Sequence, residues 1–206
     1  WMTAGGGILH IETPPEQLVI SGGLFHGLQL WVNLPAAQKM VSPAYQNLDA
    51  DQVKLFTTPD AGTLVRLIAG NIAGIQGPGS TRTPIVMAHA TILPGSQMVL
   101  PWNPAFNALA HVVKGSGFVG IDHHSFTVGQ TAVFGTGDSM TLAASPHEAL
   151  DVILLGGQPI GEPVEQYGPF VMNTRAELQQ AMDDYQRGRL GTVPSGGIQP
   201  YRGPRK

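Results

Sequence analysis

The sequence contains no cysteine and few charged residues, and both shortages restrict the classes of protein to which it can belong. Without cysteine the chain forms neither disulfides nor thiolate–metal bonds, which is compatible with a reducing compartment such as the cytoplasm. Charged residues make up 12% of the chain, against about 25% in soluble proteins generally, and the net charge is -3. This composition argues against a broad cationic surface that binds nucleic acid directly.

Long hydrophobic runs are also lacking, because glycine or proline interrupts the apolar stretches. A membrane-spanning helix needs about 20 predominantly apolar residues, and no segment provides them. The sequence also lacks a charged segment followed by an apolar one, the pattern of a signal peptide. We therefore expect a cytoplasmic protein that does not act at a membrane.

Glycine and proline are plentiful, with 27 and 17 residues, and 42% of all residues are hydrophobic. These two residues favour tight turns, and short apolar runs between turns are typical of β-barrels and β-sandwiches. The runs predicted to be strands are 29–32, 64–69, 85–93, 109–113, 118–121, 131–134, 140–143 and 149–155. Hairpin turns are predicted at 115–117 and 122–125. We expect an all-β protein with two curved sheets.

One helix is predicted near the C-terminal end. Thr174 and Glu177 have the spacing of a capping box, in which side chains satisfy backbone groups of the first helical turn. Apolar residues then recur at helical spacing: Leu178, Ala181, Met182 and Tyr185. Gly188 is the expected residue after the helix end. A shorter helical turn is predicted at 36–40, and the basic final segment is expected to be a mobile tail.

A His-x-Glu pair, His10 and Glu12, is the best candidate for a metal site. Residues two apart on a strand point to the same side, so both side chains can reach one ion. Imidazole and carboxylate together suit divalent first-row metals such as iron, manganese, nickel or zinc. Taken alone, however, the pair favours an ordinary surface or core position over a metal site, because any His-x-Glu pair on a strand has this geometry.

The other histidines give weaker signals: His26, His89, His111, His123, His124 and His147. Adjacent residues on an extended chain point apart, so we expect His123 and His124 to be solvated in a turn rather than to share a metal. The same argument applies to His147 beside Glu148. His26, His89 and His111 each stand alone, which favours hydrogen-bonded structural roles.

Three longer blocks of sequence resemble one known family. They are WMTAGGGILHIE at residues 1–12, FHGLQLWVNLP at 25–35 and EPVEQYGPFVMNT at 162–174. Together they resemble the pirin family of two-lobed cupin proteins. The resemblance implies an all-β, cupin-type double-lobed β-barrel or jelly roll, with an incomplete first lobe and a C-terminal helix. It places the end of the first lobe at 1–55, the second lobe at 56–172, the helix at 173–190 and a flexible tail at 191–206.

The resemblance also implies a metal site. Pirins bind one metal, usually iron, in the first lobe through three His and one Glu, and His10 and Glu12 match one His and the Glu. The upstream His-x-His ligands are absent from this chain, so we expect the natural protein to be longer. In the second lobe the matching positions are Pro101, Asn103 and Asn107, which predicts a lobe without metal.

The function implied by the resemblance is oxidation of quercetin-type flavonols by a quercetin 2,3-dioxygenase activity. Glu12 would then assist as a base, and an open metal position would lower the pKa of the flavonol hydroxyl. The alternative is a metal- or redox-responsive regulator that binds a transcription factor or a metabolic enzyme. A structural fragment without any metal is a third interpretation.

Overall fold

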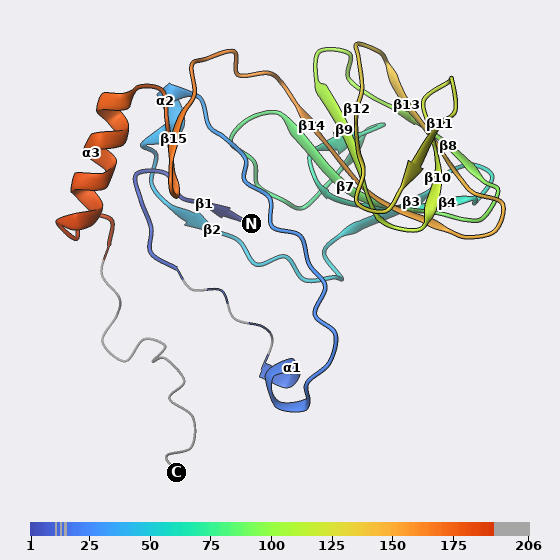
Figure 1. The fold of residues 1–206 in the computed structure, drawn as a ribbon, viewed down its shortest axis with the longest axis horizontal. Coiled ribbons are helices and arrows are strands. Elements are labelled where there is room, and N and C mark those ends of the chain that lie inside the picture. The colour runs from blue at the N-terminus through green and yellow to red at the C-terminus, as the bar shows by residue number, and fades with distance from the viewer. Residues whose placement is uncertain (11, 13, 15, 192–206) are drawn as a thin grey trace. The chain divides into compact units, whose positions relative to one another are not determined.

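The computed structural model describes residues 1–191 except 11, 13 and 15. Nearly all of the predicted tail at 191–206 therefore lies outside the described residues. The chain divides into two compact units, of which unit 1 contains Trp1 and Tyr45–Gly161. Unit 2 contains Met2–Ala44 together with the chain from Glu162 onward. Figure 1 shows the order of the elements along the chain.

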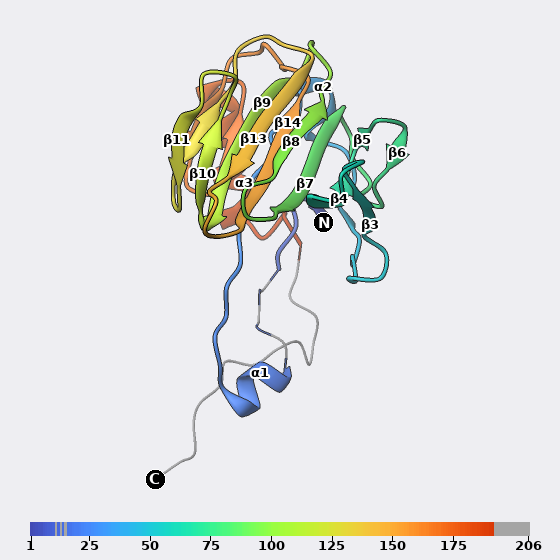
Figure 2. The same cartoon turned by 90° about the vertical axis from the view of Figure 1, so that its right-hand side faces the viewer.

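Unit 1 contains two antiparallel sheets that face each other (Figure 2). The six-stranded sheet has the order β12 (Thr131–Val133), β9 (Asn107–Lys114), β14 (Leu150–Gly157), β7 (Ile85–Ile92), β4 (Thr63–Ala69) and β3 (Lys54–Thr57). The four-stranded sheet has the order β11 (His124–Thr127), β10 (Ser116–Val119), β13 (Ser139–Ala144) and β8 (Gln97–Pro101). A short hairpin of β5 (Asn71–Ile72) and β6 (Ile75–Gln76) follows β4.

The core of unit 1 lies between these sheets. Along β4 and β7 every second residue is buried, as expected for strands with one face turned inward. The largest fully buried side chains include Leu67, Met98, Leu142 and Leu154, which come from both sheets. The alternating apolar pattern of the sequence is thus satisfied by packing one sheet on the other.

The mostly β fold with a C-terminal helix is confirmed, but two local predictions are wrong. The run 29–32 is not a strand, and within the described part of the chain no strand pairs with it. The turn at Gly115 closes no hairpin, because β9 and β10 belong to different sheets. Gly115 has φ +83°, and a Cβ there would lie 2.0 Å from the Ala149 carbonyl oxygen, so this crossing between sheets requires glycine. The second predicted hairpin joins β10 to β11.

Unit 2 is built from two distant segments of the chain. Its first segment contains β1 (Met2–Thr3), α1 (Glu16–Ser21) and α2 (Ala36–Lys39), and β1 pairs with β2 (Ala44–Tyr45) where the chain passes into unit 1. Its second segment contains the hairpin of β15 (Glu165–Tyr167) and β16 (Phe170–Met172), followed by α3 (Arg175–Gln186). The predicted helical turn at 36–40 is confirmed as α2.

Helix α3 begins and ends as the sequence predicts. Thr174 is its N-cap, and the Thr174 hydroxyl oxygen accepts a hydrogen bond from the Glu177 backbone N–H at 3.2 Å. Gly188 follows the helix end with φ +68°, the left-handed conformation that glycine adopts readily. On its apolar face Leu178 is buried, and the Tyr185 ring lies 6.3 Å from that of Phe170 on β16. None of the helices within the described residues is long and apolar enough to cross a membrane.

Candidate functional site

The predicted ligands His10 and Glu12 lie on an extended segment of unit 2 that follows the glycines of the first sequence block. Gly5 has φ +55°, and a Cβ at this position would lie 2.0 Å from the Val41 carbonyl oxygen. The next residue, Gly6, donates its N–H to the same oxygen at 2.9 Å. Glycine therefore allows the two backbones to approach, and this contact fixes where the segment carrying His10 and Glu12 begins.

His10 and Glu12 do lie close together. His10 Nδ1 is 4.0 Å from Glu12 Oε1, and the side chains are 44% and 65% exposed. Gln29 donates a hydrogen bond from Nε2 to the same Glu12 oxygen at 2.7 Å. The prediction that a strand carries the pair is wrong, because neither residue belongs to a strand and β1 ends at Thr3. The two side chains are brought together by an irregular segment instead.

His10 and Glu12 are suitable types of metal ligand, but two ligands are fewer than a stable site requires. A neutral imidazole and a carboxylate are ligands that divalent first-row metals accept. Stable transition-metal sites generally use at least three protein ligands. Among residues 1–191 without 11, 13 and 15, no group of three or more His, Asp or Glu side chains has a geometry that could hold an ion. The described residues therefore provide two ligands and not a complete site.

A second polar cluster lies on the six-stranded sheet of unit 1. Arg66 Nη1 donates to Thr91 Oγ1 at 2.8 Å, and this hydroxyl donates to Asp151 Oδ1 at 2.6 Å. His89 Nε2 lies 3.3 Å from the same carboxylate oxygen. The strands β4, β7 and β14 are neighbours, and their register places Arg66 opposite His89 and Thr91 opposite Asp151. The four side chains therefore form one network.

Burial and the nearby Arg66 charge favour the neutral form of His89. Burial lowers the pKa of His89, and the Arg66 guanidinium lowers it further, while Asp151 opposes both effects. A neutral imidazole with its proton on Nε2 donates to Asp151, which matches the hydrogen-bond geometry. The network is thus satisfied internally and has the character of a structural cluster. Sequence alternation indicated that His89 faces one side of β7, but the partners Arg66 and Asp151 depend on strand register.

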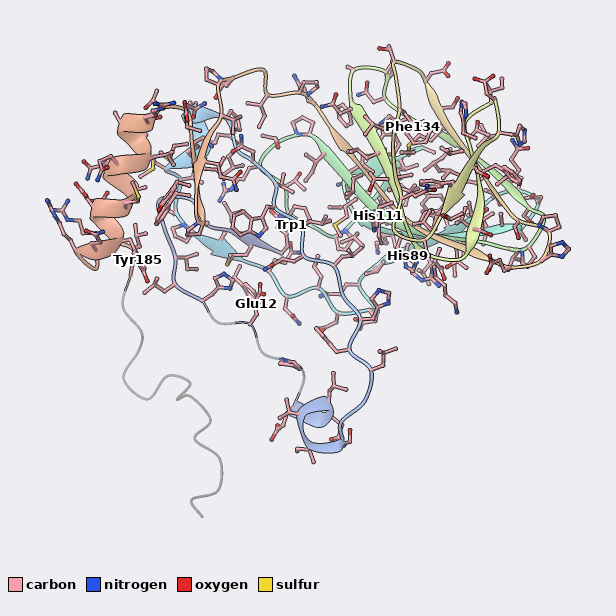
Figure 3. All side chains as sticks on the ribbon, viewed as in Figure 1. Trp1, Glu12, His89, His111, Phe134 and Tyr185 are labelled. Atoms are coloured by element: carbon pink, nitrogen blue, oxygen red, sulfur yellow. The ribbon has the colours of Figure 1, made fainter. Side chains whose placement is uncertain are left out.

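The positions of His111 and His124 agree with the roles expected of them. His111 Nδ1 lies 2.8 Å from Thr131 Oγ1. His89 and His111 stand on the two strands that flank Ile153 of β14, and Figure 3 labels both. His124 and Asp122 stand 4.0 Å apart with side chains that are 77% and 80% exposed. These positions support structural or solvated roles rather than metal binding.

Comparisons with known proteins identify the family. The model of the Pirin C-terminal cupin domain matches residues 87–191. Pirin-1 of Arabidopsis thaliana is 39% identical over 194 residues, which cover 93% of this chain and 65% of that protein. The chain belongs to the pirin family. Human Pirin is 36% identical over 193 residues and is covered to 64%, so the chain spans about two thirds of the length of these pirins.

A solved structure supports the same assignment. The crystal structure of a quercetin 2,3-dioxygenase from Acinetobacter baumannii aligns with a TM-score of 0.74 and 32% identity. The alignment covers 80% of this chain and 56% of that protein. The expected cupin fold is therefore confirmed for this pirin.

Proposed function

We propose that this pirin is part of a metal-dependent oxygenase that acts on quercetin-type flavonols. The observation that carries the proposal is the 32% identity and TM-score of 0.74 to a quercetin 2,3-dioxygenase over 80% of the chain. The proximity of His10 and Glu12, with Nδ1 and Oε1 4.0 Å apart, supports it from the site itself. Iron is the metal that we propose, and the absence of cysteine supports a cytoplasmic location.

His10 and Glu12 have distinct roles in this proposal. Both provide ligand atoms, and a bound metal supplies Lewis acidity that makes a flavonol hydroxyl easier to deprotonate. The Gln29 amide holds Glu12 Oε1 at 2.7 Å, so it fixes the orientation of the carboxylate. Glu12 Oε2 receives no hydrogen bond from any described side chain or backbone group, and this oxygen is suited to accept the hydroxyl proton.

The test combines metal analysis with oxygen uptake in the presence of quercetin, using the full-length gene product. We expect about one iron per chain and oxygen consumption that depends on quercetin. His10→Ala should lose both properties while it retains the fold. Gln29→Leu should weaken metal binding by about 10–100-fold, because it removes the hydrogen bond that orients Glu12. The matched control is His26→Ala, which changes an exposed histidine close in sequence.

The regulatory alternative makes a different prediction for the same experiment. A protein that senses metal and binds a transcription factor or a metabolic enzyme would hold iron in stoichiometric amount but would not consume oxygen with quercetin. That result would favour the regulator over the oxygenase. Loss of turnover in His10→Ala with the fold intact would favour catalysis. A full-length protein with neither iron nor turnover contradicts both.

A further inference from the structure

A cavity opens at one end of the β-sandwich in unit 1, and it takes no part in the proposed oxygenase function. Its volume is about 500 Å³. The residues that line it come from the β5–β6 hairpin, the loop between β6 and β7, the start of β7, the end of β8 and the loop that follows β8. The mouth of a β-barrel is a common place for a small-molecule site, and such sites measure about 300–1,000 Å³.

Three apolar residues of the lining belong to the packed core of unit 1. Ile72, Val86 and Trp102 line it, and they are only 2%, 4% and 7% exposed. Trp102 Nε1 lies 3.3 Å from the Asn107 carbonyl oxygen and donates to it, which holds the indole in place. Phe106 adds a second aromatic ring to the lining. Two aromatic side chains and a rigid apolar wall favour a ligand that contains a ring.

The polar side chains of the cavity are all uncharged: Asn71, Gln76, Thr81 and Asn103. None of the residues that line the cavity carries an ionisable side chain. Asn103 Oδ1 accepts a hydrogen bond from the Ala105 N–H at 3.0 Å, so the amide oxygen is engaged. No described residue accepts a hydrogen bond from the Asn103 NH₂ group, which can donate to a ligand.

These observations define the chemistry of a ligand. An ion placed in this cavity would lose hydration without gaining a countercharge, which is costly.

We infer that this cavity binds an uncharged aromatic small molecule. Its ring packs against Trp102 and Phe106, and a carbonyl or hydroxyl oxygen accepts a hydrogen bond from the Asn103 amide. Binding requires no metal and does not involve His10 or Glu12. The inference is therefore independent of the oxygenase proposal and goes beyond it.

A matched pair of probes tests the chemistry of the site. Methyl 4-hydroxybenzoate and 4-hydroxybenzoate share one ring, but only the second carries a negative charge at neutral pH. Titration of the chelator-treated protein, followed by NMR of the three tryptophan indole N–H groups, reports binding and its location. We expect the ester to shift the Trp102 signal, assigned with Trp102→Phe, and to leave the exposed Trp31 signal unchanged. The carboxylate should bind about ten-fold more weakly or worse.

Two variants locate the binding. Asn103→Leu should weaken binding of the ester by about five-fold or more, because it removes the amide donor at nearly constant volume. Asn47→Leu is the control, since Asn47 is also in unit 1 and does not line the cavity. Retained thermal stability of Asn103→Leu shows that the fold is intact. Equal binding of both probes, a Trp102 signal that does not move, or an Asn103→Leu variant that binds normally would each overturn the inference.

Discussion

The interactions that stabilise unit 1 of this pirin differ from those that stabilise unit 2. In unit 1 the apolar side chains of two sheets form one buried core. In unit 2, among the residues that the structure describes, Leu178 is the only buried hydrophobic residue. Large apolar side chains of unit 2 are exposed instead, with Leu24 at 92% and Trp31 at 62%. Hydrophobic burial therefore explains the stability of unit 1 but contributes much less to that of unit 2.

Polar contacts within and between its two chain segments hold unit 2 together. Glu162 Oε2 accepts hydrogen bonds from the Ala36 N–H at 2.7 Å and from the Asn173 amide at 2.9 Å. Lys39, which is 7% exposed, donates to Asn33 Oδ1 at 2.6 Å and to the Val171 carbonyl oxygen at 3.1 Å. We call these contacts the Lys39–Glu162 clamp. Charged hydrogen bonds here replace part of the packing that a hydrophobic core would supply.

We expect the largest effect from a leucine-to-alanine substitution, which can be made in both units. Leu142 is fully buried in unit 1, so Leu142→Ala should lower the free energy of unfolding by about 2–5 kcal/mol. Leu24→Ala in unit 2 should change it by no more than about 0.5 kcal/mol, since the side chain already contacts solvent. Urea unfolding followed by fluorescence measures both. Equal losses in the two variants would show that unit 2 also has an apolar core.

The same contrast explains what could be predicted from the sequence. Alternation located β4, β7 and β9, because each of these strands buries every second residue against the opposite sheet. The short apolar run 29–32 is not a strand, since a strand also needs a neighbouring strand with which its backbone forms hydrogen bonds. Alternation of buried and exposed residues does not indicate which sheet a strand joins. The sequence therefore predicts a hairpin at Gly115, although β9 and β10 belong to different sheets.

The candidate site was predicted less completely than the fold. The family resemblance, rather than spacing alone, singled out His10 and Glu12, and these two side chains do lie close together. Their partner Gln29 is 17 residues from Glu12, and the Arg66–Asp151 network joins three strands, so no local motif could indicate either. The capping pair Thr174 and Glu177 was predictable because all its interactions are local.

A second prediction concerns the Lys39–Glu162 clamp. Lys39→Met keeps an aliphatic chain but leaves Asn33 Oδ1 and the Val171 carbonyl without their shared donor. We expect a loss of about 1–3 kcal/mol, because these two partly buried acceptors would lose a charged donor. Amide hydrogen exchange of α3 and the β15–β16 hairpin measures the effect on unit 2 locally. Lys54→Met, at an exposed position of β3, is the control. If amide hydrogen exchange in α3 and the β15–β16 hairpin is the same in both variants, Lys39 does not stabilise unit 2.

A third prediction concerns the start of α3. Thr174→Ala removes the hydroxyl that accepts from the Glu177 N–H, and it should reduce the stability of the helix by about 1 kcal/mol. Thr174→Ser retains the hydroxyl and should restore most of this loss. Hydrogen exchange of the first turn of α3 distinguishes the two variants. A Thr174→Ser variant that frays as much as Thr174→Ala would contradict the capping role.

The smallest effect is a pH dependence that belongs to unit 1. Burial and Arg66 lower the pKa of His89 below its ordinary value of 6.5, while Asp151 opposes them. Between the lowered pKa and about 6.5 the unfolded chain binds more protons at this position than the folded chain does. The free energy of unfolding should therefore fall as the pH decreases from about 6.5 through the lowered pKa, and then level off.

Replacement of the imidazole tests this source of the pH dependence. Urea unfolding of the wild type and of His89→Gln, from about pH 8 to about pH 5, should show a shallower decline in the variant, because its residue 89 no longer titrates. His124→Gln is the control, since this side chain is 77% exposed and should leave the decline unchanged. Parallel curves for the wild type and His89→Gln would mean that Asp151 raises the pKa of His89 by as much as burial and Arg66 lower it. In that case the Arg66–Asp151 network would stabilise the sheet equally at every pH in this range.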